Sequence, residues 1–231
     1  MPTTLHILPT AQLAERVLLP GDPGRALLLA QALLEQPRMF NHNRGLWGYT
    51  GAAADGEPLT IQSTGMGGPS AAIVIEELLR LGARRIVRVG SCGALQEGLA
   101  LGDAVVVEEA ICSDGTSRAL GAGERVAGDA ALTAALATAA AADGGARRGP
   151  VVTTDLFYDP AGEHADPAPG DALAIEMETA TLFQLGALRE LSAGCVLVVS
   201  DLLGSQRGRI DAETMEAAAI RVGRIAAAAL S

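Results

Sequence analysis

The residues Arg88 to Gly93, with the sequence Arg-Val-Gly-Ser-Cys-Gly, bring together three kinds of anion-binding group. Arg88 ends an apolar run that predicts a buried strand, and the small residues after it, including Ser91, predict a turn. A guanidinium, a hydroxyl and open backbone N–H groups are the donors that an oxyanion such as phosphate needs. The segment therefore predicts an oxyanion site.

Two further segments repeat this combination of arginine with glycine. They are Gly21-Asp22-Pro23-Gly24-Arg25 and Asn43-Arg44-Gly45. Together with Arg88 they supply three guanidinium groups, whose forked donors suit a dianion. The three segments point to phosphate as a ligand.

Other residues have side chains that could act on a sugar or a base. In Glu176-Met177-Glu178, a carboxylate can accept from two sugar hydroxyls while methionine offers an apolar face. The alternative is a helix start whose carboxylates complement the helix dipole. Phe157 has the ordinary alternative of a core residue. Asp201 follows an apolar run that predicts a strand, so it would stand at a strand end.

The composition excludes several classes of function. The formal net charge is −10, so a general basic surface for nucleic acid is absent and nucleic acid is not an expected partner. All 17 basic residues are arginine, which excludes a P-loop lysine, a Schiff-base lysine and a lysine general base. Any phosphate site must therefore be local.

The cysteines and histidines show no spacing typical of a disulfide framework or of a metal site. They are Cys92, Cys112, Cys195, His6, His42 and His164. No metal is predicted. Because the chain has no 18-residue apolar run and no leader-like start, no membrane partner is expected. These features predict a reducing, cytoplasmic setting.

Strands and helices are expected to alternate along a single domain of residues 1–231. Apolar and β-rich runs predict strands at 16–20, 46–53, 59–63, 86–89, 104–107, 151–153 and 194–199. Helices are expected at 23–34, 70–82, 129–142, 178–191 and 211–230. In the second helix, Glu76, Glu77 and Arg80 are expected on a face away from the apolar one. The alternation predicts an α/β fold, a three-layer α/β/α sandwich.

The motifs stand in the order that is found in one family. They are Gly-Asp-Pro at 21–23, Gly-Met-Gly-Gly-Pro-Ser at 65–70, Arg-Val-Gly-Ser at 88–91, Asp-Leu-Phe-Tyr at 155–158, Glu-Met-Glu at 176–178 and Ser-Asp at 200–201. From about His6 to the final helix, the chain resembles the nucleoside phosphorylase-I family. That family includes purine nucleoside phosphorylases, uridine phosphorylases and methylthioadenosine/S-adenosylhomocysteine nucleosidases, and the resemblance is closest to the hexameric purine enzymes. It implies a central mixed, partly barrel-like twisted sheet flanked by helices.

The resemblance implies how phosphate would be held. The matching residues within one chain are Gly21, Arg25, Arg88 and Ser91. Arg44 and His6 match a phosphate arginine and a ribose 5′-hydroxyl histidine that come from the neighbouring subunit. A homo-oligomer with active sites shared across a dimer interface is therefore implied. A hexamer, built as a trimer of dimers, is expected, with a dimer as the alternative.

The resemblance also implies the nucleoside contacts. The matching residues are Cys92, Gly93, Phe157, Glu176, Met177 and Glu178. Glu178 would bind the ribose hydroxyls and Met177 would pack on the ribose. Glu176 would lie near the base, on which Phe157 would stack. Asp201 matches the catalytic aspartate that protonates or hydrogen-bonds a purine at N7 and the 6-substituent, for which it must carry or share a proton.

The implied reaction is the reversible phosphorolysis of purine (deoxy)ribonucleosides to the free base and (deoxy)ribose 1-phosphate. Inorganic phosphate is then a co-substrate, and no cofactor is expected. A uridine phosphorylase or a broad-specificity enzyme is the alternative, because segments 63–81 and 115–118 are as similar to the uridine branch. Against it, the Gln-x-Arg pair with which uridine enzymes read uracil does not follow Phe157.

Two other functions remain as alternatives. A nucleosidase places water where phosphate would be and does not need Arg25, Arg44 and Arg88. A nucleoside-binding protein on the same fold would not need Asp201 together with the arginines. The complete set of these residues argues against both.

One position departs from the purine pattern. Purine enzymes carry an arginine a dozen or so residues after the aspartate, where it promotes proton donation, but that spacing reaches Thr214 here. Arg207 or Arg209 could take this part. If neither does, oxopurine nucleosides are expected to be preferred to adenosine.

Overall fold

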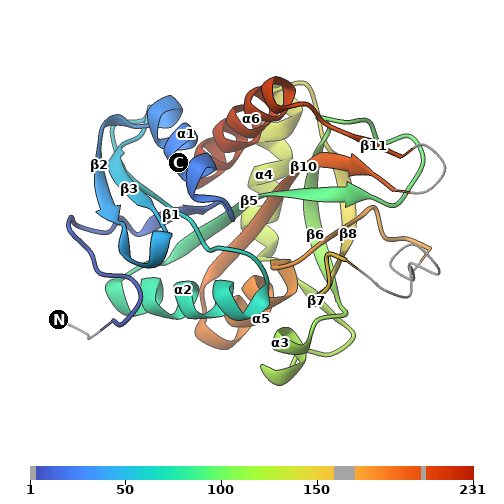
Figure 1. The fold of residues 1–231 in the computed structure, drawn as a ribbon, viewed down its shortest axis with the longest axis horizontal. Helices are drawn as coiled ribbons and strands as arrows, with labels where there is room; N and C mark the ends of the chain where they lie inside the picture. Colours follow the sequence, from blue (N-terminus) through green and yellow to red (C-terminus); the bar gives the residue numbers. More distant parts are fainter. Residues whose placement is uncertain (1–3, 159–169, 204–206) are drawn as a thin grey trace.

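The computed structural model describes residues 4–158, 170–203 and 207–231. Within them, eleven strands form one mixed sheet, and helices cover both of its faces (Figure 1). The α/β class and the three-layer arrangement that the sequence predicts are confirmed. No helix of this described part is long and apolar enough to cross a membrane.

The elements follow one another along the chain as expected for an α/β protein. The strands are β1 (Arg16–Leu19), β2 (Glu35–Asn41), β3 (Gly48–Ala52), β4 (Pro58–Gln62), β5 (Arg85–Ala94), β6 (Ala104–Cys112), β7 (Arg125–Ala127), β8 (Arg147–Thr153), β9 (Ala174–Glu176), β10 (Ser192–Leu202) and β11 (Gly208–Arg209). The helices are α1 (Pro23–Leu33), α2 (Gly68–Leu81), α3 (Gly115–Ala119), α4 (Ala130–Ala142), α5 (Thr179–Arg189) and α6 (Ala212–Leu230), with a short 3₁₀ helix η1 (Asn43–Gly45).

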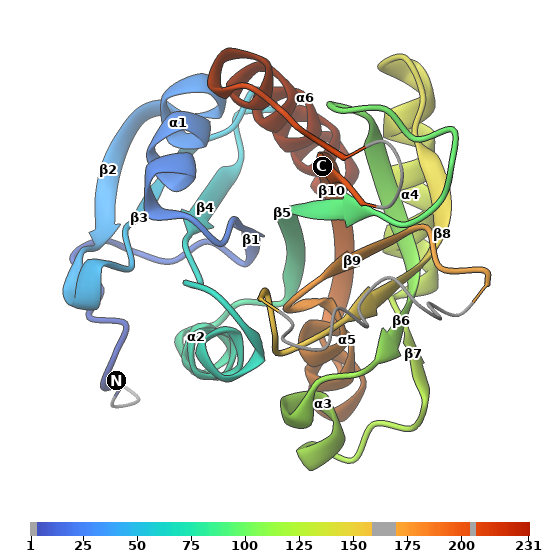
Figure 2. The same cartoon turned by 45° about the vertical axis from the view of Figure 1, so that its right-hand side comes forward.

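Part of the sheet closes on itself. Neighbouring strands follow the order β11-β10-β6-β8-β9-β5-β1-β4-β3-β2, with β7 paired to β6. Because β10 also pairs with β5, strands β10, β6, β8, β9 and β5 form a ring, from which β1, β4, β3 and β2 continue as an open sheet (Figure 2). This is the mixed, partly barrel-like sheet that the resemblance implies.

Alternate residues of the central strands face two apolar cores. Val17 and Leu19 of β1 pack in the core that includes α2 and α5, whereas Leu18 packs in the core of α1, α4 and α6. Val87 and Val89 of β5 also belong to this second core. The side chain between them therefore points to the α2 and α5 side of the sheet. That side chain is Arg88.

Helix boundaries follow from local capping chemistry. Asp22, Asp129 and Asp211 precede α1, α4 and α6, and each carboxylate accepts a first-turn backbone N–H at 2.8–2.9 Å. Gly82 ends α2 with a φ of 115°, in the left-handed region that glycine adopts freely. These boundaries agree with the sequence-based expectation within one or two residues.

The predicted turn at 90–93 is wrong. Residues Gly90 to Ala94 continue β5, because β10 pairs with them up to Ala94, across a bulge between Val199 and Asp201. On the other edge of β5, β1 pairs only up to Arg88, and β9 pairs from Gly93 onward. Among the described strands, residues 89–92 thus have no neighbour on that edge. The gap opens the sheet next to Arg88.

Six short elements were not predicted from the sequence. They are β2, η1, α3, β7, β9 and β11. In β2, five consecutive residues are exposed, so the strand carries no alternating apolar pattern. β7 and α3 are three and five residues long, which is too short for any period to be visible.

Candidate active site

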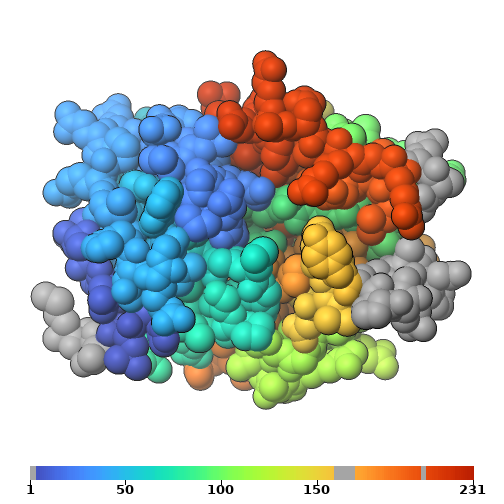
Figure 3. Space-filling view, in the orientation of Figure 1, coloured from blue at the N-terminus to red at the C-terminus, as the bar shows by residue number. Residues whose placement is uncertain are grey.

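A cavity of about 1080 Å³ lies beside the gap in the sheet. Its walls come from the start of α1, the segment before α2, β5 beyond Arg88, the segment after β8, β9 and the residues around β11. Figure 3 shows the hollow between the teal segment before α2, the gold segment after β8 and the red segment near β11. The predicted site residues that line it are Gly21, Arg25, Arg88, Ser91, Cys92, Gly93, Phe157, Glu176, Met177, Glu178 and Asp201.

Arg88 is buried at 5% exposure and rests on two carboxylates. Its Nε lies 3.1 Å from Oε2 of Glu176, and its Nη2 lies 2.5 Å from Oε2 of Glu178. Burial alone would lower the pKa of Arg88, but the charges of Glu178 and Glu176 outweigh burial and raise it. Its Nη1 is buried and has no hydrogen-bond partner among the described residues. Arg88 is thus a fixed cation with one donor group to spare.

The acceptor positions of the Glu176 carboxylate are all used by groups of the protein itself. The carboxylate accepts from the Thr153 hydroxyl at 2.5 Å and from the backbone N–H groups of Glu178 and Thr179 at 2.9 Å, besides Arg88. The last two groups belong to the start of α5, where a negative charge is favourable. The resemblance placed Glu176 near the base. Its observed contacts instead favour a part in orienting Arg88.

Glu178 joins the start of α2 to Arg88. Its Oε1 accepts from the backbone N–H of Gly67 at 2.5 Å. Burial and the neighbouring charge of Glu176 raise the pKa of Glu178, while Arg88 acts against them. Both oxygens are held, but a carboxylate has about four acceptor positions, so Glu178 can still accept from a ligand hydroxyl.

Arg25 brings a second guanidinium to the same cavity. Burial, followed by the positive charge of Arg88, lowers the pKa of Arg25, and Asp22 and Glu178 oppose this only in part. Two like charges that are held close together repel each other until an anion lies between them. The pair is therefore suited to a small oxyanion.

Asp201 follows the bulge in β10, with its side chain 28% exposed. The Ser200 hydroxyl donates to its Oδ2 at 2.7 Å and lies 3.2 Å from the carbonyl oxygen of Cys92. Arg209 faces Asp201 across the β10–β11 pair, with Nε 3.8 Å from Oδ1. Arg207 also lines the cavity, and residues 204–206 lie outside the described part of the chain.

Thr214 takes no part in this cluster. Its hydroxyl donates to Oδ2 of Asp211 at 2.6 Å and so belongs to the cap of α6. This explains why the purine-type spacing does not lead to a charged partner for Asp201 here.

Apolar residues form the rim of the cavity. Phe157 is 62% exposed and meets Tyr158 edge-on, with 5.0 Å between the ring centroids. Met66, from the segment before α2, is 85% exposed and also lines the cavity. Cys92 lies deeper, and burial raises the pKa of its thiol, so it stays protonated and does not act as a nucleophile.

His6 and Arg44 do not line this cavity. Nδ1 of His6 lies 2.8 Å from Oε1 of Glu77 in α2, and Arg44 is exposed on η1 with a φ of 59°. The Asn43 side chain donates to the carbonyl oxygen of His6 at 3.0 Å. The structure thus holds the two residues near each other but outside the chain's own cavity.

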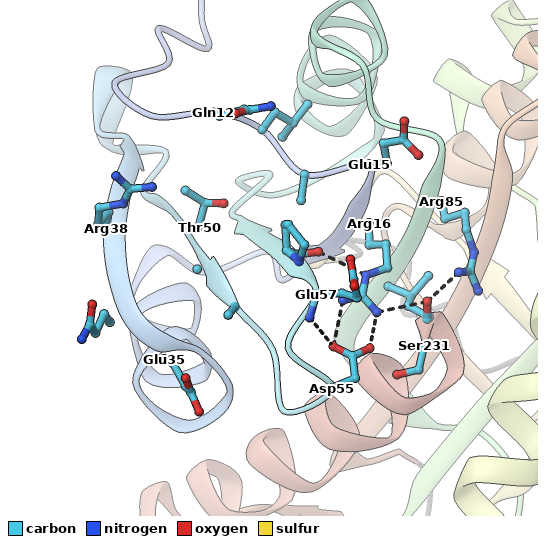
Figure 4. Close-up of a pocket in the computed structure, with 17 residues that line it drawn as sticks. Gln12, Glu15, Arg16, Glu35, Arg38, Thr50, Asp55, Glu57, Arg85 and Ser231 are labelled. Atoms are coloured by element: carbon cyan, nitrogen blue, oxygen red, sulfur yellow. Dashed lines mark hydrogen bonds and ion pairs between the residues drawn. The ribbon is translucent and has the colours of Figure 1, made fainter.

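A second cavity, of about 1060 Å³, contains none of the predicted site residues. Two of the arginines that line it, Arg16 and Arg85, are partnered within the chain (Figure 4). Arg16 forms two hydrogen bonds with Asp55, at 2.6 and 3.1 Å, and Arg85 donates to the carbonyl oxygens of Leu230 and Ala229 at the end of α6. In this cavity, Arg85 therefore binds the C-terminal end of α6. Over residues 4–158, 170–203 and 207–231, no group of acidic, histidine or cysteine side chains is placed to hold a metal ion.

The comparison with known families decides what kind of protein carries this site. The sequence model of the Phosphorylase superfamily matches residues 15–231. The chain belongs to this superfamily. The match covers every element of the described fold and all of the residues that line the first cavity.

Three of the proteins that are similar to this chain are named phosphorylases. The chain is 40% identical to a guanosine phosphorylase of Halorubrum lacusprofundi over 84% of its own length and 82% of the relative. It is 37% identical to a DeoD-type purine nucleoside phosphorylase of Geobacillus kaustophilus, over 83% of each chain. It is 38% identical to a uridine phosphorylase of Treponema pallidum, over 88% of its own length and 83% of the relative.

Sequence reasoning missed three residues that shape the site. Met66 is part of a motif that was noted, but nothing indicated that its side chain lines the cavity. Glu77 was expected on an exposed helix face, and the structure buries it at 6% exposure. Its position three residues after the apolar Val74, which puts the two on neighbouring parts of one helix face, could have indicated this. The sequence predicts Gly90 in a turn, whereas it lies in β5, where the absence of a side chain leaves space for the guanidinium of Arg88.

The contact between Gly90 and Arg88 yields a prediction. A Cβ at residue 90 would lie 2.7 Å from Nη2 of Arg88 and 2.8 Å from Cδ2 of Leu197. Gly90→Ala should therefore displace the guanidinium and raise the KM for phosphate by about 10-fold, the loss of roughly one charged hydrogen bond. Initial rates at varied phosphate would measure this. Gly123→Ala is the matched control, since a Cβ there meets nothing within 4 Å; an unchanged KM in Gly90→Ala would contradict the prediction.

Proposed function

We propose that the protein is a purine nucleoside phosphorylase. It transfers the (deoxy)ribose of a purine nucleoside to inorganic phosphate and releases the free base and (deoxy)ribose 1-phosphate, in a reversible reaction. The observation that carries this proposal is the buried Nη1 of Arg88, without a partner in the described chain, in the same cavity as the guanidinium of Arg25.

Phosphate fits this pair of guanidinium groups better than water does. A hydrolase needs only a positioned water, which a single acceptor can hold. The buried Arg88 and the half-buried Arg25, in the same cavity as the Ser91 hydroxyl and Gly21, instead supply several donors to an anion with several acceptor oxygens. The comparisons support the same choice, since the relatives named above are all phosphorylases.

The sugar would lie between the phosphate and the purine, above Met177. The free acceptor positions of Glu178 would take the ribose hydroxyls, and Met177 would pack on the sugar. Attack by a phosphate oxygen at C1′ forms the new C–O bond as the glycosidic C–N bond breaks. The electron pair of that bond leaves with the base, so stabilising the base is the second task of the site.

Asp201 would supply the proton that the leaving base needs. In its protonated form it can donate to N7 of the purine, which neutralises the base as it leaves. The Ser200 hydroxyl can serve both states of Asp201. It donates to the carboxylate, or it turns toward the Cys92 carbonyl and accepts from the carboxylic acid, because a hydroxyl both donates and accepts.

The uridine alternative rests on the 38% identity to the Treponema pallidum enzyme. Asp201 with Ser200 favours a purine, since a purine has N7 and a 6-substituent within reach of such an acid. The similarity to a guanosine phosphorylase also supports a purine.

A complete site would need a second copy of the chain. Within one chain, Arg88 is ion-paired with Glu176 and Glu178, so these carboxylates offset part of the positive charge that Arg88 and Arg25 present to a dianion. Arg44 of a second copy would supply the missing cation. We therefore propose a homo-oligomer with shared sites, a hexamer formed as a trimer of dimers.

The surface that carries His6 and Arg44 is suited to such contacts. Exposed apolar side chains lie within five residues of His6 or Arg44 in the chain. They are Leu5, Leu8, Met39 and Trp47. Their burial against a second copy would remove apolar surface from water, which favours association.

No cofactor has a part in the proposed chemistry, because phosphate supplies the nucleophile and Asp201 the proton. All three cysteines are free and buried, which suits a reducing compartment. We propose a cytoplasmic enzyme of purine salvage on this basis.

The first test measures dependence on phosphate. Base release from inosine, guanosine, adenosine, uridine and methylthioadenosine should be compared with and without phosphate. We expect purine release only with phosphate, formation of ribose 1-phosphate, and a loss of about 10²–10⁴-fold in kcat for Asp201→Asn. Release without phosphate would contradict the phosphorylase proposal, and faster turnover of uridine than of inosine would contradict the purine preference.

The shared site can be tested by mixing subunits. Arg44→Ala impairs the site of its neighbour, and Asp201→Asn impairs its own site. Co-expressed with different tags, the two variants should form mixed dimers in which one of the two sites is intact. Statistical mixing then restores about a quarter of the wild-type rate. A rate no higher than the mean of the two separate variants would show that each site is made by one chain.

Arg209 is proposed as the cation that assists Asp201. Because its side chain is 79% exposed and 3.8 Å from Asp201, we expect Arg209→Ala to lower kcat/KM for purine nucleosides by only about 3- to 5-fold. Arg207→Ala is the comparison, since Arg207 lines the same cavity close by in the chain. Steady-state kinetics with inosine and adenosine would measure both. Parent-like kinetics for Arg209→Ala would remove Arg209 from the mechanism.

A further inference from the structure

Glu77 of α2 anchors the segment that carries His6. The carboxylate is buried at 6% exposure and accepts from three successive backbone N–H groups, those of Leu5 at 3.1 Å, His6 at 2.9 Å and Ile7 at 2.7 Å. Its Oε1 also lies 2.8 Å from Nδ1 of His6. A buried carboxylate is costly unless it is paired in this way. The Glu77 carboxylate thus binds the backbone of residues 5–7 and fixes it to α2.

This contact determines which nitrogen of His6 donates. Burial raises the pKa of Glu77, but the Ile7 N–H and the His6 ring, with the other N–H groups, outweigh it and bring the pKa to about 2. The carboxylate is therefore ionised at neutral pH and can only accept, so Nδ1 of His6 must carry the proton. In a neutral ring, Nε2 is then the acceptor.

Further hydrogen bonds join this segment to the loop that carries Arg44. Asn43 donates to the carbonyl oxygen of His6, as described above. Asn41 accepts from the backbone N–H of Leu8 at 2.9 Å and donates to the carbonyl oxygen of Leu46 at 2.6 Å. His6 and Arg44 thus belong to one hydrogen-bonded unit that Glu77 fixes to α2.

We propose that Glu77 is a positioning residue for the active site of a neighbouring copy of the chain. By fixing His6 with Nδ1 as donor, it presents Nε2 as an acceptor for the 5′-hydroxyl of the nucleoside bound in that copy. Glu77 thereby selects nucleosides with a 5′-hydroxyl over 5′-deoxy nucleosides. The inference rests on the proposed function, in which His6 completes the neighbouring site.

A merely structural Glu77 would behave differently. If it only anchored the N-terminal segment, its loss would lower stability and slow all nucleosides alike. If it sets the His6 ring, its loss affects only substrates that can use Nε2. The ratio of kcat/KM for inosine to kcat/KM for 5′-deoxyinosine separates the two cases.

The test uses Glu77→Gln, His6→Ala and the double variant at saturating phosphate. The introduced glutamine keeps the size of the side chain but turns an amide N–H₂ toward donors. We expect Glu77→Gln to lower the inosine-to-5′-deoxyinosine ratio by about 5- to 10-fold, through KM for inosine, as the loss of one hydrogen bond predicts. His6→Ala should do the same, and the double variant should show no further loss.

Glu76→Gln is the matched control. Glu76 is the preceding residue of α2 and pairs with Arg189 on the surface, at 2.8–3.0 Å, away from residues 5–7. In Glu76→Gln, the ratio of kcat/KM for inosine to kcat/KM for 5′-deoxyinosine should equal that of the wild type. An equal loss for both substrates in Glu77→Gln, or a further loss of the ratio in the double variant, would overturn the inference.

A second measurement needs no variant. In the ¹⁵N-labelled wild-type oligomer, the ring shifts of His6 should show a protonated Nδ1 and an unprotonated Nε2 at neutral pH. A ring with Nδ1 unprotonated, or with both nitrogens protonated, would overturn the inference even if Glu77→Gln failed to fold. If no nucleoside were phosphorolysed at all, the proposed function would fail while the ring shifts still tested the geometry. If the wild type showed phosphate-dependent activity but equal kcat/KM for inosine and 5′-deoxyinosine, the inference would fail while the proposed function would stand.

Discussion

The ion pairing of Arg88 with Glu176 and Glu178 is the interaction on which the site depends. It joins β5 to the starts of α2 and α5, since Glu178 also binds the N–H of Gly67 and Glu176 binds the N–H of Thr179. A buried pair of this kind contributes little net stability, but removing either partner leaves an uncompensated charge. The carboxylates therefore act mainly by fixing where the guanidinium points and which of its nitrogens remains available.

The sheet makes this arrangement possible by leaving an edge open. Residues 89–92 are supported by β10 on one side, while on the other side β1 has ended and β9 has not begun. A fully paired sheet would offer neither space nor free backbone beside Arg88. The cavity is thus a consequence of strand register, and the bulge before Asp201 places the acid at the same gap.

The sequence predicted those parts of the molecule that local chemistry determines. The bounds of α1, α2, α4 and α6 and the central apolar strands were predicted from single residues and hydrophobic periods. The motifs also identified many of the residues that line the cavity. What they could not predict depends on contacts between distant segments: that 90–93 stays extended against β10, that Glu176 is consumed by Thr153 and α5, and that Glu77 turns inward to meet residues 5–7.

The depth of the cavity has a consequence for the order of events. Arg88 lies at its floor at 5% exposure, whereas Phe157 at the rim is 62% exposed. A nucleoside seated between Phe157 and Glu178 would cover any anion that Arg88 holds. Phosphate must then enter before the nucleoside, and the free base must leave before the sugar phosphate. The topography of the site, more than the relative affinity of its ligands, would set the kinetic sequence.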